Sequence, residues 1–314
     1  MQHARLAAFL ILAVAFQEAT FAQSTSVFGF LGNDAGARAA ALAGSFVSVA
    51  GDVNGLFYNP ASLATLDSTQ GSAGFFKHLL DINAGYLSYG RRISDDGAIG
   101  AGIIYTNYGS FDERDDLGNT IGSFTPADLA LILGYATTID ENLYAGAGFK
   151  FIHSSIAEYH STAIAADAGV LYLIPEHRIA LGASIRNIGT QLSTYAGVHE
   201  QLPLDLTIGG SIIPRGLPLL FNMNFHKLNA VADNFGGHFR AFTVGGEFTL
   251  SRVLQLRVGY NNEQRLDLKT GTTAGMAGLS IGLGITVSRY RVDYALSSLG
   301  TIGNFHRISL SSGF

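Results

Sequence analysis

Residues 33–66 read NDAGARAAALAGSFVSVAGDVNGLFYNPASLATL and form the one long stretch after the N-terminus that does not alternate like a β-strand. The alanine-rich first part suits a short helix. A second helix start is indicated by Asn59, a capping residue, followed by Pro60 at the first helical position. The Gly-, Asp- and Asn-rich residues 51–55 between them suit tight turns. From Asp67 onward the chain instead reads as a series of β-hairpins.

The chain after Gln70 alternates with a period of two. Segments 143–151, 179–186, 219–226 and 254–261 each place apolar side chains at every second position and polar or small ones between them. Because side chains alternate across a strand, each segment has one apolar face and one polar or small face. Two segments are less clear: 82–92 has no decisive face, and 129–136 is apolar on both.

The connections between these segments alternate in length. Outer-membrane barrels have this pattern because their periplasmic turns are short and their extracellular loops are long, whereas a soluble β-sandwich has no reason to sort its loops. The pattern predicts an all-β protein, a transmembrane antiparallel barrel of about fourteen strands with both termini on the periplasmic side. The short connections are 94–97, 140–142, 175–177, 214–218, 251–252 and 288–289, and the longer ones are 108–125, 157–161, 188–201, 228–237, 262–273 and 299–305.

The composition agrees with a barrel. The 314 residues are 47% apolar and 14% charged, yet no run approaches the ~18 apolar residues of a membrane helix. The net charge of −5 gives no argument for nucleic acid. With no cysteine, disulfides and thiol chemistry are excluded. The chain ends on Phe314, in a strand with Ile308 and Leu310 on the same face, as barrels use for their assembly signal.

The chain divides into three predicted parts. Residues 1–22 look like a secretory signal, with an apolar core and a small-residue cleavage site. Residues 23–68 are expected to form a plug, or hatch, inside the barrel, and residues 69–314 the barrel itself. The expected anchors of the plug are Asp34, Arg38, Asp52, Asn54, Asn59 and Pro60.

Charged residues recur on the polar faces of the strands. A basic residue facing lipid near the membrane midplane would cost ~2–4 kcal/mol, so these side chains are expected to face the lumen. They either pair with one another there or contact the plug or a ligand, and Arg38 and Asp52 are plausible partners. The set is Lys150, Asp167, Arg186, Glu247, Arg257, Arg291, Asp293 and Arg307.

The long connection 108–125 is expected to be extracellular, because its charges need water. Those charges are Asp112, Glu113, Arg114, Asp115 and Asp116. Nothing predicts an enzyme: there is no G-x-S-x-G or H-E-x-x-H motif, and no phosphate loop with its lysine. No cofactor or metal site is predicted either. The glycines of 278–284 are instead expected to let a strand lie against bulky neighbours or the plug.

The irregular segment also resembles a known family. Residues 34–44 (DAGARAAALAG), 52–54 (DVN) and 59–61 (NPA) resemble the N-terminal signature of the PorV/PorQ family of the type IX secretion system of Bacteroidota and relatives. Gly36 stands where Ser is common, and Ala43 precedes Gly44 where two glycines are usual. Residues 107–112, 118–124, 150–155 and 187–192 resemble the PorQ branch in particular.

The resemblance implies a fold and a function. The fold would be a FadL-like barrel of fourteen strands with an N-terminal hatch. The function would be a docking scaffold in the outer membrane of a Gram-negative bacterium, working with other type IX secretion proteins such as a PorZ-like surface partner of the attachment complex. A FadL-like transporter for hydrophobic small molecules is the alternative, and an apolar lumen pocket with a lateral opening would favour it. The plug segment argues against an open porin.

Overall fold

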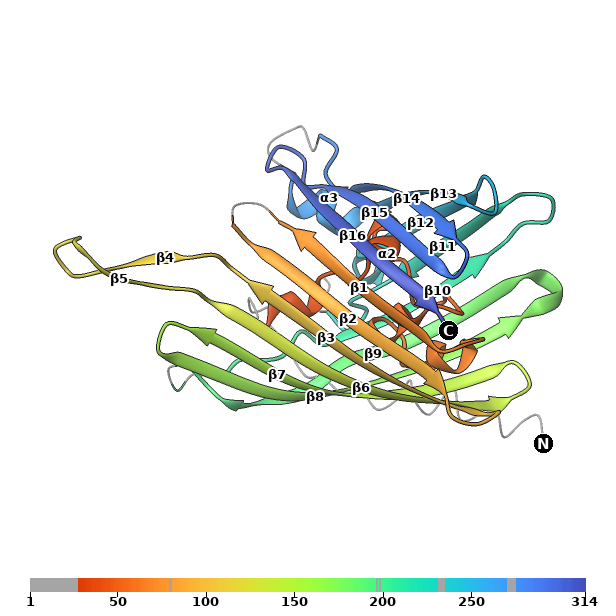
Figure 1. The fold of residues 1–314 in the computed structure, drawn as a ribbon, viewed down its shortest axis with the longest axis horizontal. Coiled ribbons are helices and arrows are strands. Elements are labelled where there is room, and N and C mark those ends of the chain that lie inside the picture. Colours follow the sequence, from red (N-terminus) through yellow and green to blue (C-terminus); the bar gives the residue numbers. More distant parts are fainter. Residues whose placement is uncertain (1–27, 79–80, 196, 198, 231–234, 270–274) are drawn as a thin grey trace.

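The computed structural model describes residues 28–78, 81–195, 197, 199–230, 235–269 and 275–314. The signal peptide expected at 1–22 lies outside these residues. Fourteen antiparallel strands close into one barrel, which confirms the predicted fold class (Figure 1). Within the described residues, no helix is both long enough and apolar enough to cross a membrane.

The barrel strands vary in length from seven to sixteen residues. They are β1 Gln70–Lys77, β2 Asn83–Arg92, β3 Gly97–Asn107, β6 Ala127–Asp140, β7 Leu143–Ile156, β8 Tyr159–Ile174, β9 Ile179–Ser193, β10 Asp205–Ile212, β11 Leu219–Phe225, β12 Phe242–Thr249, β13 Leu254–Asn261, β14 Leu279–Val287, β15 Tyr290–Ser298 and β16 Asn304–Gly313.

Each strand pairs with its neighbours in the chain, except that β3 pairs directly with β6. The barrel closes where β1 meets β16, in a register that runs from Gln70 opposite Gly313 to Lys77 opposite His306. Closure pairs every strand on both sides, so the barrel itself has no open sheet edge.

The outward face of the barrel is apolar. In β6, Leu131, Leu133 and Tyr135 are exposed on this face, whereas Ala130 and Ile132 are buried on the other. An apolar surface that runs around a whole barrel is accounted for by membrane lipid. The inward face of β6 is apolar as well, which is why the sequence alone did not orient this segment.

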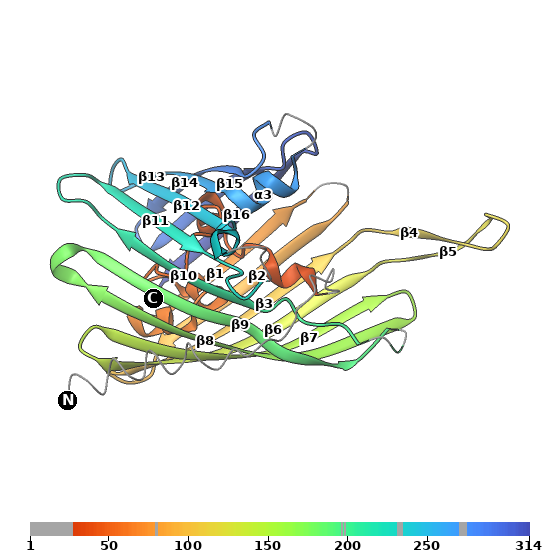
Figure 2. The same ribbon diagram turned by 180° about the vertical axis from the view of Figure 1, so that it is seen from behind.

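The connections follow the predicted alternation, with two corrections. The connection expected at 157–161 shortens to residues 157–158, because β7 and β8 continue toward it. The connection 108–125 is not a plain loop: β4 (Phe111–Arg114) and β5 (Thr120–Phe124) pair within it as a two-stranded ribbon. This ribbon projects well beyond the barrel wall, at the end where the longer connections lie (Figures 1 and 2).

The plug segment lies inside the barrel, where it forms four short helices. The α-helix α2 (Ala37–Ala41) packs on β13 to β16, the 3-10 helix η2 (Val53–Phe57) on β1 to β3, and η3 (Pro60–Thr65) mainly on β6 to β8. The sequence therefore folds into a unit that contacts the wall on opposite sides. The remaining helices are η1 Gly29–Gly32, η4 Pro175–His177, η5 Phe235–Phe239 and α3 Asn262–Asp267.

Candidate functional site

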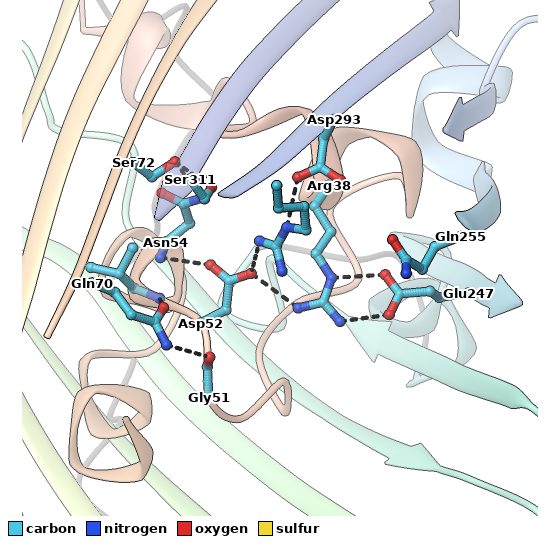
Figure 3. A network of polar contacts seen from close by, with 12 residues as sticks. Arg38, Gly51, Asp52, Asn54, Gln70, Ser72, Glu247, Gln255, Asp293 and Ser311 are labelled. Atoms are coloured by element: carbon cyan, nitrogen blue, oxygen red, sulfur yellow. Dashed lines mark hydrogen bonds and ion pairs between the residues drawn. The ribbon is translucent and has the colours of Figure 1, made fainter. Parts of the chain in front are cut away.

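The plug is joined to the wall through Arg38, on α2. Its guanidinium donates from Nε and Nη2 to the two carboxylate oxygens of Glu247 on β12, at 2.8 and 2.7 Å, and from Nη1 to Asp52 at 3.0 Å. Asp52 also accepts from Nη2 of Arg291 on β15, at 2.8 Å. A bidentate arginine–carboxylate pair fixes orientation as well as distance. Figure 3 shows Arg38 between Glu247 and Asp52.

The wall closes these contacts into a ring. Arg257 on β13 donates to Glu247 at 2.6 Å and to Asp293 at 2.6 Å, and Arg291 donates to Asp293 at 2.9 Å. Three arginines and three carboxylates thus alternate around a closed circuit, and their formal charges cancel. We call these residues the charge ring: Arg38, Glu247, Arg257, Asp293, Arg291 and Asp52.

The charge ring is buried, so each charge depends on its partners. Arg257 is 2% exposed. Burial alone would raise the pKa of Asp52, but the charges of Arg291 and Arg38 outweigh it and lower that pKa to about 2. For Arg38, burial acts to lower the pKa, and Glu247 and Asp52 together raise it above its ordinary value. Asp52 and Arg38 therefore stay ionised at neutral pH.

Next to the charge ring, Asn54 is held by hydroxyl groups of the wall. Its amide nitrogen lies 3.3 Å from Ser72 Oγ and 3.3 Å from Tyr86 Oη, and its oxygen accepts from Ser88 Oγ at 2.8 Å. Asp52 caps η2 by accepting from the Asn54 backbone N–H at 3.0 Å. This cluster fixes the turn that the sequence indicated at 51–55.

The second predicted helix start is also in contact with the wall. The Asn59 side chain caps η3 by accepting from the Ala61 N–H at 3.1 Å, and its amide donates to the carbonyl of Val170 on β8 at 2.9 Å. Pro60 follows at the first helical position. Gly146 on β7 makes this approach possible, since a Cβ there would lie 2.4 Å from the Ala61 nitrogen. Gly282 similarly leaves room for Ala41, as was expected of the glycines in 278–284.

Other predicted lumen charges pair across the wall. Lys150 Nζ lies 2.8 Å from Asp167 and donates to the side chain of Asn187 at 2.6 Å. Arg186 pairs with Asp205 and donates to the backbone carbonyl of Phe57 in the plug at 3.0 Å.

Asn187 and Asp205 were not singled out from the sequence. The wall is irregular between Ala166 and Ala168, where β8 pairs with β9, and Asn187 has a positive φ of 61°. A bulge interrupts the alternation of side chains along the strand, so the sequence pattern did not show which face Asn187 lies on. Asp205 was detectable, because it shares the polar face of β10 with Thr207 and Ser211.

Arg307, on β16, differs from the other lumen arginines. It is 4% exposed, yet it forms no ion pair with a carboxylate of the described residues. Its Nη1 donates to Ser297 Oγ at 3.1 Å, and its Nε has no hydrogen-bond partner in the described part of the chain. The guanidinium lies 5.5 Å from the ring centre of Phe76 and 5.4 Å from that of Phe305.

A cavity of about 960 Å³ lies between the plug and the longer connections. Its lining is mixed: apolar side chains such as Leu31, Phe57 and Leu202 alternate with charged ones, including Asp34 and Arg307. Asp34 also accepts a hydrogen bond of 3.3 Å from the Tyr58 hydroxyl. This cavity was not foreseen, because it arises from residues distant in the sequence.

A second hollow lies on the outward face of the wall, where β1 meets β2 and β16. It measures about 600 Å³, and its rim includes Phe75, Leu87 and Ile308. Gly74 leaves room here for the ring of Tyr86, because a Cβ on Gly74 would lie 2.3 Å from that ring. The Tyr86 hydroxyl in turn lies 3.3 Å from the side-chain nitrogen of Asn54 in the plug. We call this hollow the wall groove.

The predicted charges of the 108–125 connection are all solvent-accessible. Asp112, Glu113 and Arg114 lie on β4, and Arg114 pairs with Asp112 at 3.1 Å. Asp115 orders the tip by accepting from the backbone N–H groups of Leu117 and Asn119, at 2.9 and 2.8 Å. The same turn includes Asp116. Leu117 is 86% exposed at this tip.

The site contains little that would support catalysis. Among the described residues, no group of three or more His, Cys, Asp or Glu side chains is placed to hold a metal ion. The charged groups of the plug instead pair with the wall. The arrangement therefore binds and orients the plug, and it leaves one mixed cavity above it.

No protein-family model and no curated protein sequence matches the chain. Solved structures do. The Ralstonia pickettii toluene transporter TbuX has a TM-score of 0.59 at 14% identity, covering 90% of this chain and 99% of that one. The Pseudomonas putida toluene transporter TodX has a TM-score of 0.56 at 12% identity, covering 87% and 95%. A Pseudomonas aeruginosa FadL homologue has a TM-score of 0.54 at 12% identity, covering 89% and 98%.

This chain has the fold of these proteins. At such identities the likeness establishes the fold alone, and the function has to be argued from the site itself.

Proposed function

We propose that this protein is an outer-membrane channel through which small, largely apolar molecules enter a Gram-negative cell. The observation that carries the proposal is the cavity of about 960 Å³ above the plug. It lies at the end of the barrel with the longer connections, which face the outside in outer-membrane barrels. Cavities of this size that combine apolar side chains with a few polar groups are typical of small-molecule sites.

The plug blocks the lumen below the cavity. A molecule can therefore leave the cavity only if the plug shifts relative to the wall. The wall groove offers an apolar exit toward lipid, since Gly74 and Tyr86 line it and the Tyr86 hydroxyl contacts Asn54 of the plug. The toluene transporters with the same fold support a hydrophobic substrate.

A reversible lock on the plug tests this route. A Cβ on Gly245 would lie 2.5 Å from Ser45 Oγ in the plug, so Ser45→Cys with Gly245→Cys should form a disulfide in a chain that has no other cysteine. Cells that express the oxidised variant should take up radiolabelled toluene no faster than cells without the protein, and reductant should restore uptake. The single variant Gly245→Cys is the control, because it adds the same side chain next to the plug without the disulfide.

Two outcomes would contradict the proposal. One is that the intact protein gives no uptake above the empty-vector background. The other is that the oxidised variant transports as fast as the reduced one, which would exclude a route through the plug.

We propose, as a second candidate function, a docking scaffold of the type IX secretion system in Bacteroidota or their relatives. The sequence signature at 34–61 motivates it, and the β4–β5 ribbon supports it. A two-stranded ribbon alone is marginally stable in water, and this one presents Leu117 and Ile121 to solvent together with four carboxylates and one arginine. These features suit a surface partner, such as the PorZ-like component of an attachment complex.

Removing the ribbon separates the two functions. Asn107 pairs with Ala127, so an Asn-Gly turn can replace residues 108–126 and leave the barrel intact. A scaffold should then lose surface retention of secreted cargo, whereas toluene uptake should persist. The variant Leu117→Ser serves as a milder control with the ribbon present. Unchanged cargo retention would contradict the scaffold.

A further inference from the structure

The outward face of the wall changes from apolar to polar along four neighbouring strands. β3, β2, β1 and β16 lie side by side where the barrel closes (Figure 1). Their registers align outward apolar side chains around the wall groove, and they align a row of polar side chains on the extracellular side of it. We call this polar row the rim row; it consists of Asn107, Asn83, Lys77 and His306.

The rim row lies one step along the strands from the wall groove. Phe75 of the groove shares the outward face of β1 with Lys77, and Ile308 shares that of β16 with His306. Residues two apart on a strand lie on one face, about 7 Å from each other. A molecule with an apolar chain in the groove can therefore place a polar head at the rim row.

Lys77 and His306 form the cationic part of the rim row. They are directly opposite each other in the pairing of β1 with β16, which brings their Cβ atoms to about 5 Å. Both side chains are exposed. Nδ1 of His306 is hydrogen-bonded to the Tyr294 hydroxyl at 2.8 Å, which holds the imidazole ring in place. Within the described part of the chain, Lys77 forms no ion pair with a carboxylate.

Aromatic side chains indicate that this end of the wall lies at the level of the lipid head groups. Phe225, Phe242 and Tyr260 cluster on the outward face where β11, β12 and β13 reach the longer connections, with ring centres 6.4 and 6.0 Å apart. Outer-membrane barrels have such aromatic girdles at the membrane interface. The rim row lies at the corresponding ends of its strands, so it faces head groups.

We propose that the wall groove and the rim row together bind one phosphorylated lipid of the outer leaflet. An acyl chain lies in the groove along Ala73, Leu87 and Ile308, and the phosphate contacts Lys77 and His306. A groove alone would take any chain, whereas the cation beside it selects an anionic head group through charge-assisted hydrogen bonds. The inference goes beyond the proposed function, because this site faces the membrane and is filled whether or not molecules cross the barrel.

The test compares two lipids that share their acyl chains and differ in phosphate. The full-length barrel, delipidated in a non-ionic maltoside, is titrated with lipid A and with dephosphorylated lipid A, and bound lipid is counted by native mass spectrometry. Lipid A should bind about tenfold or more tightly, the range expected for hydrogen bonds to a charged group. The double variant Lys77→Gln with His306→Gln should bind both lipids equally.

Arg91→Gln is the matched control for charge. Arg91 is also an exposed cation on the outward face, but it lies at the opposite, periplasmic end of β2. Its removal should leave the preference for lipid A unchanged. A preference that survives the double variant, or that Arg91→Gln reduces as much, would overturn the assignment of the head group to Lys77 and His306.

Ala73→Leu tests the groove. Ala73 lines the groove and is exposed on the lipid side, so a leucine fills the hollow without reaching the plug. It should weaken the binding of both lipids by about tenfold, the effect of uncovering roughly two CH₂ groups. Ala147→Leu makes the same change on the outward face of β7, away from the groove, and should have no effect. Equal effects of the two leucines would contradict a chain in the groove.

Inorganic phosphate separates a lipid from a free anion. At the concentration of lipid A it should not displace the lipid, because it has no chain to place in the groove. Displacement by phosphate, or equal binding of the two lipids by the intact protein, would overturn the proposal. All the changed side chains are exposed, so every variant should keep the folded gel mobility of the intact protein.

Discussion

Two buried arginine sites in the lumen are built in opposite ways. In the charge ring, Arg38, Arg257 and Arg291 each contact two carboxylates, and the circuit closes on itself. At the other site Arg307 lies close to two aromatic rings and one serine, and among the described residues it has no carboxylate at contact distance. The difference shows that lumen arginines have distinct roles: those of the charge ring join the plug to the wall through carboxylates, whereas Arg307 contributes no such ion pair.

The largest expected effect separates these two sites by stability. Arg257→Met leaves Glu247 and Asp293 each short of a partner in a buried setting, and breaking such a pair costs about 3–5 kcal/mol. The free energy of unfolding in lipid vesicles, followed in urea by gel mobility, should fall by this amount. Arg307→Gln, an equally buried arginine, is the matched control. Equal losses in the two variants would contradict the distinction between arginines paired with carboxylates and the unpaired Arg307.

A smaller effect is expected from the glycines that face the plug. Gly245 and Gly246 are neighbours on β12 and face opposite sides. A Cβ on Gly245 would lie 2.9 Å from the backbone oxygen of Leu42 in the plug, whereas one on Gly246 would meet nothing closer than 3.4 Å. Gly245→Ala should therefore cost about 1–3 kcal/mol by overpacking. Gly246→Ala should cost nothing measurable; a loss as large as that of Gly245→Ala would contradict close packing of plug and wall.

The pH dependence of the charge ring follows from Asp52. Its folded pKa of about 2 lies below its ordinary value of 3.8. The stabilisation is therefore complete above about pH 4 and is lost as the pH falls toward 2. The shift corresponds to about 2 kcal/mol. Urea midpoints of the intact protein should fall in this window, and Asp52→Asn should remove this part of the fall. An identical pH profile in Asp52→Asn would show that Asp52 does not titrate there.

Much of the architecture was predictable from the sequence, because it rests on periodic patterns. Alternation in segments such as 143–151 gave the faces of the strands, and the lengths of the connections gave the barrel and its even strand number. Asn59 and Pro60 marked a helix start that the structure retains as η3. In β6 both faces are apolar, so the alternation between polar and apolar residues could not identify the inward face. That face is apolar because Leu56 and Leu63 of the plug pack against it.

The candidate site was less predictable, because pairing depends on distance in space. Arg307 looked like Arg257 in the sequence, since both alternate onto a polar face. Only the fold shows that Arg257 contacts Glu247 and Asp293, while Arg307 contacts aromatic rings. Asn187 lies at a bulge, which interrupts the alternation on which such predictions depend. The cavity, likewise, is shaped by residues from the plug and from several strands.

The central claim is that the plug, held by the charge ring, closes the barrel. About eight strands is the size at which side chains alone fill a barrel, so fourteen enclose space that another element must occupy. Single-channel conductance in planar bilayers tests this most directly, comparing the intact protein with a variant that lacks residues 34–65. The intact protein should be silent to ions and the deletion variant should conduct. A deletion variant that keeps its folded gel mobility and conducts no more than the intact protein would contradict the account.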